Sequence, residues 1–308
     1  MRIKSYIFLL LVLSHNLAFS EKVLVITSAY NRPDFIELQD QTLKKFLKDD
    51  YEFVVFNDSP QPHMRQAIMD TCQRLGIQCI NIPQSIHTKP YLKRLPGDNF
   101  QTPSVRNSNV VQYALDTMGF AHEGIVAILD SDMFLVKEFS IKQFLEGYEI
   151  GGVPQAYENR GIRIPYIWIG IAFLDMSKLP DRQSINFNCG KIQGVPVDAG
   201  GYTYYYLSQH PEIQVRYFPS FHSSNFSCPE CLKRRENYPC PHNRNLLREI
   251  GLSERQIDFV HSGLENVEFF IEGTFFHYRS GTNWDKKTQA FHDNKTRIFN
   301  AYMEELLK

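Results

Sequence analysis

Apolar residues near the start of the chain follow two alternating patterns. The stretch at 23–28 is rich in β-branched residues and apolar on both faces, which predicts a buried parallel strand. Two further strands are predicted at 51–56 and 77–82. The stretches between them, 34–47 and 63–75, carry apolar residues at roughly helical spacing and therefore predict helices. This alternation of strand and helix is typical of a doubly wound α/β sheet.

The pattern continues with one more helix and strand before it becomes mixed. Thr102-Pro103-Ser104 opens a helix that we expect to run to about Met118, and 124–129 form the clearest buried strand of the chain. The later pattern predicts three further strands, at 151–155, 168–175 and 267–277. It also predicts one helix, at 202–208. We therefore expect an α/β protein whose sheet is mixed, mostly parallel and flanked by helices.

Polar clusters follow three of the predicted strands. Tyr30-Asn31-Arg32 follows the first, Asp58 the second, and Asp130-Ser131-Asp132 the strand at 124–129. Ligands of open α/β sheets bind beyond the carboxyl ends of the strands. The sequence therefore predicts one binding site at this edge of the sheet.

Two aspartates one residue apart follow the buried strand at 124–129. In an extended segment the side chains of Asp130 and Asp132 point the same way, so two negative charges share a small volume. Each would raise the pKa of the other unless a cation lies between them, and a hard divalent ion such as Mg²⁺ or Mn²⁺ suits oxygen ligands. This pair is our candidate metal site.

Two other interpretations of this motif stay open at this point. Asp-Ser-Asp is also an ordinary polar turn, since Asp and Ser are common turn residues. Asp-x-Asp after an apolar strand also occurs in haloacid-dehalogenase-type phosphatases. Their motif requires Thr or Val two residues after the second Asp, where Phe134 stands here.

Composition excludes some classes of function. The chain has 308 residues, a net charge of -1 and 43% hydrophobic residues, as in an ordinary globular protein. Without an excess of basic residues, no nucleic-acid partner is expected.

Residues 1–20 combine a basic start, an apolar run and a small-residue end at Ala18-Phe19-Ser20. They predict a signal peptide, or alternatively an uncleaved anchor that would be the one contact with a membrane.

Several segments together resemble GT-A nucleotide-diphospho-sugar transferases. They are the first strand and its loop at 25–33, the second strand at 54–59, the helix at 105–115, and the strand that enters Asp130-Ser131-Asp132. The resemblance implies a GT-A (Rossmann-like) domain over 21–308, with a nucleotide-binding half at about 21–140 and an acceptor half at about 141–308. It also implies transfer of a sugar from a nucleotide-diphosphate donor to a hydroxyl on a glycan, protein or lipid.

The resemblance assigns four residues to the donor nucleotide. Asp58 would meet the base or ribose, Tyr30 and Arg32 would lie near the nucleotide, and Arg106 would lie near the diphosphate or the donor sugar. Two of these have plainer interpretations. Arg106 could lie on a solvated helix face, and Tyr30 could be a packed aromatic residue.

The resemblance also completes the metal site. Asp132 would bind the metal and diphosphate, and Asp130 the metal or the donor ribose. The C-terminal segment 275–284 is similar to a strand end where a His binds the metal and a Trp closes over the donor; these would be His277 and Trp284. Neutral imidazole is a good ligand for Mn²⁺-like ions, although a single His is more often only a hydrogen-bonded polar residue.

The acceptor side is less defined. Residues 168–175 look like the acceptor-side strand of these enzymes, and Trp168 could stack on a sugar. Asp198 falls where inverting members place their catalytic base, but an Asp before small residues and a helix is also typical of an N-cap. Retention and inversion both stay open, and so does a catalytically silent GT-A domain that binds a glycan or nucleotide.

Four residues in a loop insertion have the spacing of a structural zinc site. Cys228 and Cys231 are followed by Cys240 and His242, a set that could bind Zn²⁺ tetrahedrally. Disulfides compete with this interpretation, because secretory compartments oxidise thiols.

Nucleotide sugars occur in the cytosol and in the Golgi and endoplasmic reticulum lumen. With a signal peptide, the lumen or secretion is expected rather than the cytoplasm.

Overall fold

The computed structural model describes residues 22–87, 103–159, 161–222, 244–249, 251–261, 267–281 and 288–308. The expected signal peptide at 1–20, Trp284, and the candidate zinc ligands Cys228, Cys231, Cys240 and His242 lie outside these ranges. Within the described ranges, no helix has the length and apolar composition needed to cross a bilayer.

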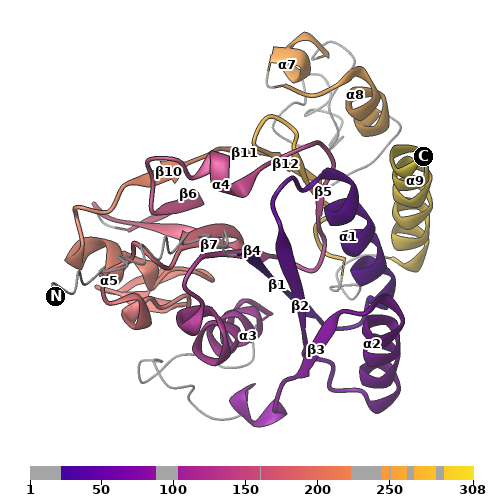
Figure 1. Cartoon of the computed structure of the whole chain (residues 1–308). Helices are drawn as coiled ribbons and strands as arrows, with labels where there is room; N and C mark the ends of the chain where they lie inside the picture. Colours follow the sequence, from indigo (N-terminus) through magenta and orange to yellow (C-terminus); the bar gives the residue numbers. More distant parts are fainter. Residues whose placement is uncertain are drawn as a thin grey trace, which may run out of the picture.

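Seven strands form the central sheet, in the order β10-β6-β7-β4-β1-β2-β3 (Figure 1). Their bounds are β1 Val23–Ala29, β2 Tyr51–Asn57, β3 Gln78–Asn81, β4 Ile125–Leu129, β6 Ile150–Asn159, β7 Ile162–Asp175 and β10 Val215–Tyr217. β1 pairs in parallel with β2 and β4, β2 with β3, and β6 with β10. β7 runs antiparallel to both β4 and β6. The expected α/β class with a mixed, mostly parallel sheet is confirmed.

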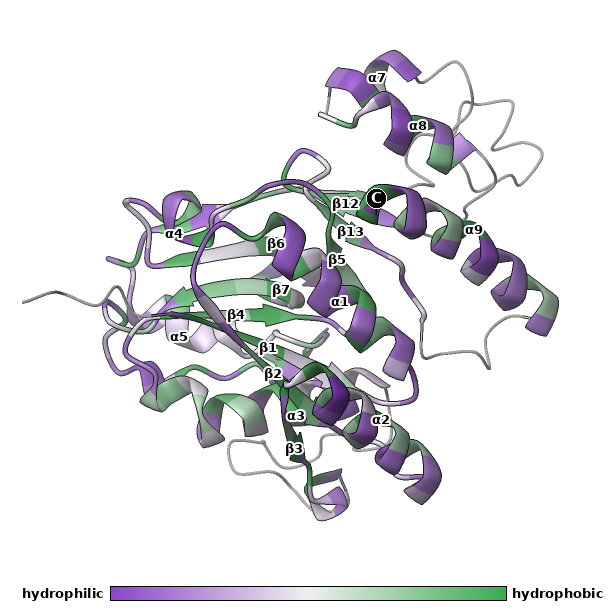
Figure 2. Cartoon of the chain, turned by 45° about the vertical axis from the view of Figure 1, so that its right-hand side comes forward, coloured by the Kyte–Doolittle hydropathy of each residue, from purple (hydrophilic) through white to green (hydrophobic). Residues whose placement is uncertain are grey.

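Helices cover both faces of this sheet (Figure 1). α1 (Pro33–Phe46) and α2 (Pro62–Leu75) pack on one face, and α3 (Pro103–Thr117) and α5 (Thr203–Gln209) pack on the other. The central strand β4 is apolar and buried along its whole length, whereas α1 and α2 carry both hydrophobic and hydrophilic residues (Figure 2). That difference follows from burial of the parallel strands on both faces.

A second sheet lies beside the first. It is antiparallel, in the order β11-β12-β13-β5, with bounds β11 Ser220–His222, β12 Glu268–Phe270, β13 Phe275–His277 and β5 Met133–Leu135. α8 (Glu254–His261) and α9 (Gln289–Leu307) share an aromatic core with it, which includes Phe134, Phe276 and Phe299. Because β5 follows β4 almost directly, the residues between them join the two sheets.

The remaining elements are short. They are the helices α4 (Ile141–Phe144) and α7 (Arg244–Glu249), the 3₁₀ turns η1 (Gln84–His87), η2 (Gly119–Ala121) and η3 (Arg182–Ser184), and the hairpin β8 (Gly190–Ile192) with β9 (Val195–Val197).

One predicted strand was wrong. Residues 267–277 form two strands, β12 and β13, joined by a turn in which Ile271, Glu272 and Gly273 all have left-handed backbone angles. In the sequence, only Gly273 indicates such a turn, because isoleucine and glutamate rarely adopt positive φ. The predicted strand at 168–175 is the second half of β7, which begins at Ile162.

Candidate metal centre

The turn that joins β4 to β5 carries the aspartate pair. The backbone N–H of Asp130 donates to the carbonyl of Gly170 on β7 (2.8 Å), and Met133 N–H donates to Asp130 O (3.0 Å). From α1, the buried Gln39 amide donates to the carbonyls of Asp130 (2.8 Å) and Met133 (2.9 Å). Three elements therefore position this turn.

The structure brings together the three residues expected to hold a metal. One ligand atom from each of Asp130, Asp132 and His277 lies within 4.8 Å of the others. His277 reaches this position because β13 pairs with β5 and sets His277 opposite Met133, next to Asp132. The His277 Nε2 to Asp132 Oδ1 distance is 3.0 Å.

Burial and mutual charge set the protonation of this cluster. Burial and the neighbouring Asp132 raise the pKa of Asp130 to about 6. Burial also opposes ionisation of Asp132, but His277, Gly281 N–H and Lys295 outweigh it and lower its pKa to about 2. Burial disfavours a charge on His277, yet Asp132 and Glu268 together raise its pKa to about 10. At neutral pH the imidazolium is therefore the cation between carboxylates.

The spacing of these donors suits a small divalent ion. Mg²⁺ takes octahedral ligands at about 2.0–2.1 Å, so neighbouring ligand atoms lie about 3 Å apart. Asp132 Oδ1 and His277 Nε2 already have this separation, at 3.0 Å. Two carboxylates and one imidazole form a donor set that Mn²⁺ and Mg²⁺ accept. An ion bound at Nε2 would replace the proton that the raised pKa of His277 keeps on the ring at neutral pH.

A turn after β13 completes the surroundings of Asp132. Arg279 and Ser280 both have positive φ (56° each), so the chain curls back and Gly281 N–H donates to Asp132 Oδ2 (2.9 Å). A Cβ at Gly281 would lie 2.6 Å from the ring of Phe35, so only glycine fits. The buried Lys295 of α9 holds this turn, because its Nζ donates to the carbonyls of Tyr278 (2.6 Å) and Arg279 (3.1 Å).

Glu268 is a site residue that sequence reasoning missed. Its Oε2 lies 2.9 Å from His277 Nδ1, on the opposite side of the imidazole from Asp132. No local pattern in the sequence marks it, because its relation to His277 exists only through pairing of β12 with β13. Asn107 was missed likewise; its side-chain amide donates to Asp130 Oδ1 (3.0 Å).

Asp58 lies at the same edge of the sheet in a network of protein partners. Arg106 Nε donates to Asp58 Oδ2 (2.6 Å), and His87 Nε2 lies 2.7 Å from Asp58 Oδ1. Arg106 also donates to Gln84 Oε1 (2.8 Å), and its guanidinium lies 4.9 Å from the ring of Tyr30. The solvated-face interpretation of Arg106 is therefore wrong. Its neighbour Asn107 contacts Asp130, so the start of α3 spans both clusters.

Arg32 belongs to the other side of the site. Its guanidinium stacks 3.6 Å above the ring of Phe35 and pairs with Asp34 (2.6 Å). Its Nη1 also reaches the carbonyl of Gly281 at 3.5 Å. Arg32 therefore lies beside the turn that holds Asp132.

Trp168 of β7 forms a wall next to His277. The two rings are 5.4 Å apart, and the indole stacks on Phe270 at 5.7 Å. The ring lies over Gly170, where an added Cβ would approach it to 2.0 Å. Since Gly170 also receives the hydrogen bond from Asp130 N–H, Trp168 and the aspartate turn depend on the same stretch of β7.

Asp198 lies in the turn between β9 and α5. Its carboxylate accepts a hydrogen bond from Ala199 N–H (2.8 Å). Tyr202 occupies the N-cap position of α5, so the N-cap interpretation of Asp198 is wrong. The turn packs against β7, because a Cβ at Gly200 would lie 2.0 Å from the carbonyl oxygen of Ile167, one residue before Trp168.

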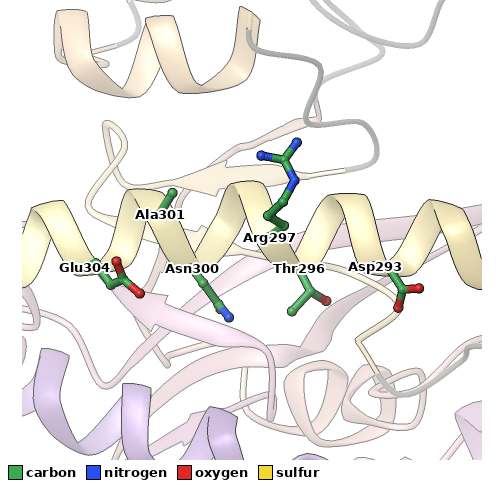
Figure 3. Close-up of a pocket in the computed structure, with 6 residues that line it drawn as sticks. All are labelled: Asp293, Thr296, Arg297, Asn300, Ala301 and Glu304. Atoms are coloured by element: carbon green, nitrogen blue, oxygen red, sulfur yellow. The ribbon is translucent and has the colours of Figure 1, made fainter.

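One surface cavity lies elsewhere. It has a volume of about 550 Å³, and its described lining residues all lie on α9 (Figure 3): Asp293, Thr296, Arg297, Asn300, Ala301 and Glu304. None of them is a predicted site residue. The chemistry-bearing side chains gather instead at the β4–β5 turn.

Comparison with known proteins gives only distant similarity. No protein-family model and no curated protein matches the chain. Among solved structures, the galactosyltransferase LgtC, solved with donor and acceptor sugar analogues, is 11% identical with a TM-score of 0.41, and covers 91% of this chain and 96% of its own. The mannosyltransferase PcManGT from Pyrobaculum calidifontis, solved with GDP-Man and Mn²⁺, is 13% identical with a TM-score of 0.38 over 65% of this chain and 55% of its own.

A third similar structure is the bifunctional glycosyltransferase WbbM without ligand. It is 10% identical with a TM-score of 0.36, over 53% of this chain and 33% of its own. The chain thus spans less than two thirds of the length of WbbM and of PcManGT. With no TM-score among the three above 0.41, this similarity by itself assigns no activity to the chain.

Proposed function

We propose that this protein is a metal-dependent glycosyltransferase that moves a sugar from a nucleotide-diphosphate donor to a hydroxyl acceptor. The observation that supports it is the meeting of Asp130, Asp132 and His277 at the carboxyl edge of the central sheet. A Mn²⁺ or Mg²⁺ ion held there would neutralise the diphosphate that leaves the sugar. The reaction class comes from the resemblance of the Asp-x-Asp segment and its flanking strands to GT-A transferases.

The residues around Asp58 would hold the nucleotide end of the donor. Arg106 is fixed by Asp58 and Gln84 through Nε and Nη2, and its side chain is 28% exposed. Within the described ranges, its recorded hydrogen bonds use Nε and Nη2, and Nη1 would donate to a phosphate oxygen. The ring of Tyr30 forms a cation–π contact with this guanidinium. Asp58 would then act mainly by holding Arg106, while the base and ribose meet the neighbouring strand ends.

Trp168 and Asp198 would serve the acceptor. During transfer, the bond from the donor C1 to the diphosphate oxygen breaks and a bond from C1 to the acceptor oxygen forms. The acceptor hydroxyl proton must go to a base. If the reaction inverts the anomeric centre, Asp198 is the candidate base, at a turn that packs on β7 next to Trp168.

Three further expectations belong to the same proposal. Residues 1–20 would direct the chain into the secretory pathway, where luminal nucleotide sugars supply the donor, and would be its one membrane contact if uncleaved. Trp284 would close over the donor. Cys228, Cys231, Cys240 and His242 would hold structural Zn²⁺, with disulfides as the alternative.

Donor hydrolysis tests this function without knowledge of the acceptor. A panel of UDP- and GDP-sugars is incubated with the protein and Mn²⁺, and free nucleotide is measured. Slow hydrolysis of one donor, abolished by EDTA and by Asp132→Asn, is expected. Asp70→Asn, on the exposed side of α2, is the matched control and should keep full activity. Nucleotide binding without hydrolysis or transfer would favour the catalytically silent domain.

A further inference from the structure

Three titratable residues lie in one row across the second sheet. His222 of β11 stands opposite Glu268 of β12, and Glu268 stands opposite His277 of β13. Residues directly opposite in an antiparallel pair project to the same face. The three side chains therefore lie on one face of the sheet, with Glu268 in the middle of the row. His277, at one end of the row, contacts Asp132 of the metal cluster.

Glu268 holds the imidazole of His277 from behind. Its Oε2 lies 2.9 Å from Nδ1, while Nε2 faces Asp132 Oδ1 at 3.0 Å. The Glu268 side chain is only 15% exposed, and its other oxygen accepts a hydrogen bond from Arg279 Nη1 at 3.3 Å. Glu268 is thus locked by two contacts in the orientation that receives the Nδ1 proton.

This contact decides which nitrogen can bind a metal. An imidazole that donates Nδ1–H to a carboxylate carries its lone pair on Nε2 once the second proton is lost. Here Nε2 is the nitrogen that faces Asp132. A carboxylate behind a metal-binding His also fixes the ring orientation and increases the basicity of the ligand.

We propose that Glu268 is a positioning residue, which holds His277 so that Nε2 binds the divalent ion. This inference rests on the proposed function, since it requires the ion at Asp130, Asp132 and His277. Loss of such a carboxylate typically weakens metal affinity about 10- to 100-fold. Glu268 itself touches neither the ion nor the substrate.

A structural role for Glu268 makes a different prediction. In that case it would act through Arg279, whose left-handed backbone begins the turn that brings Gly281 to Asp132. Removing Arg279 would then weaken metal binding as much as removing Glu268. If Glu268 acts through His277, removing Arg279 matters little.

The experiment measures Mn²⁺ binding directly, by quenching of tryptophan fluorescence. The chain has 2 Trp, so Trp284→Phe leaves Trp168, whose ring lies 5.4 Å from that of His277, as the reporter. In this background we expect Glu268→Ala to raise the Kd for Mn²⁺ about 10- to 100-fold. Glu268→Gln, which still accepts from Nδ1–H but lacks the charge, should raise it less. Arg279→Ala should stay within about threefold, as should Asp70→Asn.

Three outcomes would overturn the inference. Equal Kd values for Glu268→Ala and the parent would show that His277 needs no support. An equal loss of Mn²⁺ affinity for Arg279→Ala and Glu268→Ala would show that Glu268 acts through the turn that brings Gly281 to Asp132. If the parent itself does not bind Mn²⁺, the inference falls together with the proposed function. Melting curves in EDTA, which should be similar for Glu268→Gln and the parent, separate a loss of affinity from a loss of fold.

Discussion

His277 and Asp132 decide the chemistry at the scale of the residue. Asp132 Oδ1 lies 3.0 Å from His277 Nε2, and Glu268 Oε2 lies 2.9 Å from the other ring nitrogen. The two carboxylates raise the pKa of His277 to about 10, so Nε2 carries a proton at neutral pH. A divalent ion must displace that proton, because the same Nε2 is its ligand. Metal binding and protonation therefore compete for one atom.

Affinity for Mn²⁺ should consequently rise with pH. The carboxylates raise the pKa of His277 to about 10, so its protonated form prevails at neutral pH and each Mn²⁺ bound releases one proton. Below a pKa, competition by one proton changes the apparent Kd about tenfold per pH unit. We expect the Kd to fall about 100-fold between pH 6.5 and 8.5, measured by quenching of Trp168. A flat profile would contradict ligation through Nε2.

Gly170 is a second residue whose identity has a local cause. An added Cβ would approach the indole of Trp168 to 2.0 Å, so Gly170→Ala must displace the ring or the strand. Overpacking of this kind costs about 1–3 kcal/mol. We expect a loss of that size in the free energy of unfolding, from urea titration. In a Trp168→Ala background the same substitution should cost much less, and an equal cost there would rule out the indole as the cause.

At the scale of elements, the site depends on how α9 supports the end of β13. Lys295 is buried and donates to two carbonyls of the turn, those of Tyr278 and Arg279. Two consecutive residues with positive φ follow His277, a conformation that costs energy and persists only where the surroundings hold it. The C-terminal helix thus contributes to the metal centre without contacting it.

Lys295→Met should therefore weaken both stability and metal binding. Buried carbonyls that lose a donor cost about 1–3 kcal/mol, so the free energy of unfolding should fall by that amount in EDTA. The Kd for Mn²⁺ should also rise, because Gly281 N–H loses its fixed position. Lys48→Met is the matched control, since the exposed Lys48 side chain pairs with a carboxylate, that of Glu138, which is itself exposed. Equal effects of the two substitutions would refute this role of α9.

The sequence predicted these elements unevenly. β1, β2 and β4 each contain an uninterrupted, buried apolar run, at 23–26, 53–56 and 125–129, and these runs allowed their prediction from the sequence. The strands β12 and β13 were merged into one, because Ile271 and Glu272 adopt left-handed angles that their residue types do not indicate. Such angles are imposed by the pairing on either side of the turn.

At the scale of the whole molecule, ligand binding joins the two sheets. Asp130 and Asp132 lie where β4 passes into β5, and His277 belongs to the second sheet. An ion bound to all three adds a link between sheets that the unfolded chain lacks. Binding should therefore stabilise the whole fold by mass action.

The shift in melting temperature on ligand binding measures this stabilisation. Mn²⁺ with a nucleoside diphosphate at about 100 times its Kd adds about 2.7 kcal/mol. For a domain of this size, that corresponds to about 4–5 °C. We expect the shift for one of UDP or GDP, and its loss in Asp132→Asn. A shift of the same size in Asp132→Asn would mean that the ligands bind elsewhere.

By itself, the sequence determined the α/β alternation and the place of Asp130 and Asp132 after a buried strand, because hydrophobic periodicity and side-chain alternation are local properties of the chain. Only the tertiary structure decided which residues surround them. His277 meets Asp132 across 145 positions, and Glu268, Gly281 and Lys295 reach the site through strand pairing and helix packing. Likewise, Asp58 proved to be held by Arg106 and His87. Contacts between distant segments depend on the whole set of packed surfaces, and no short stretch of sequence contains that information.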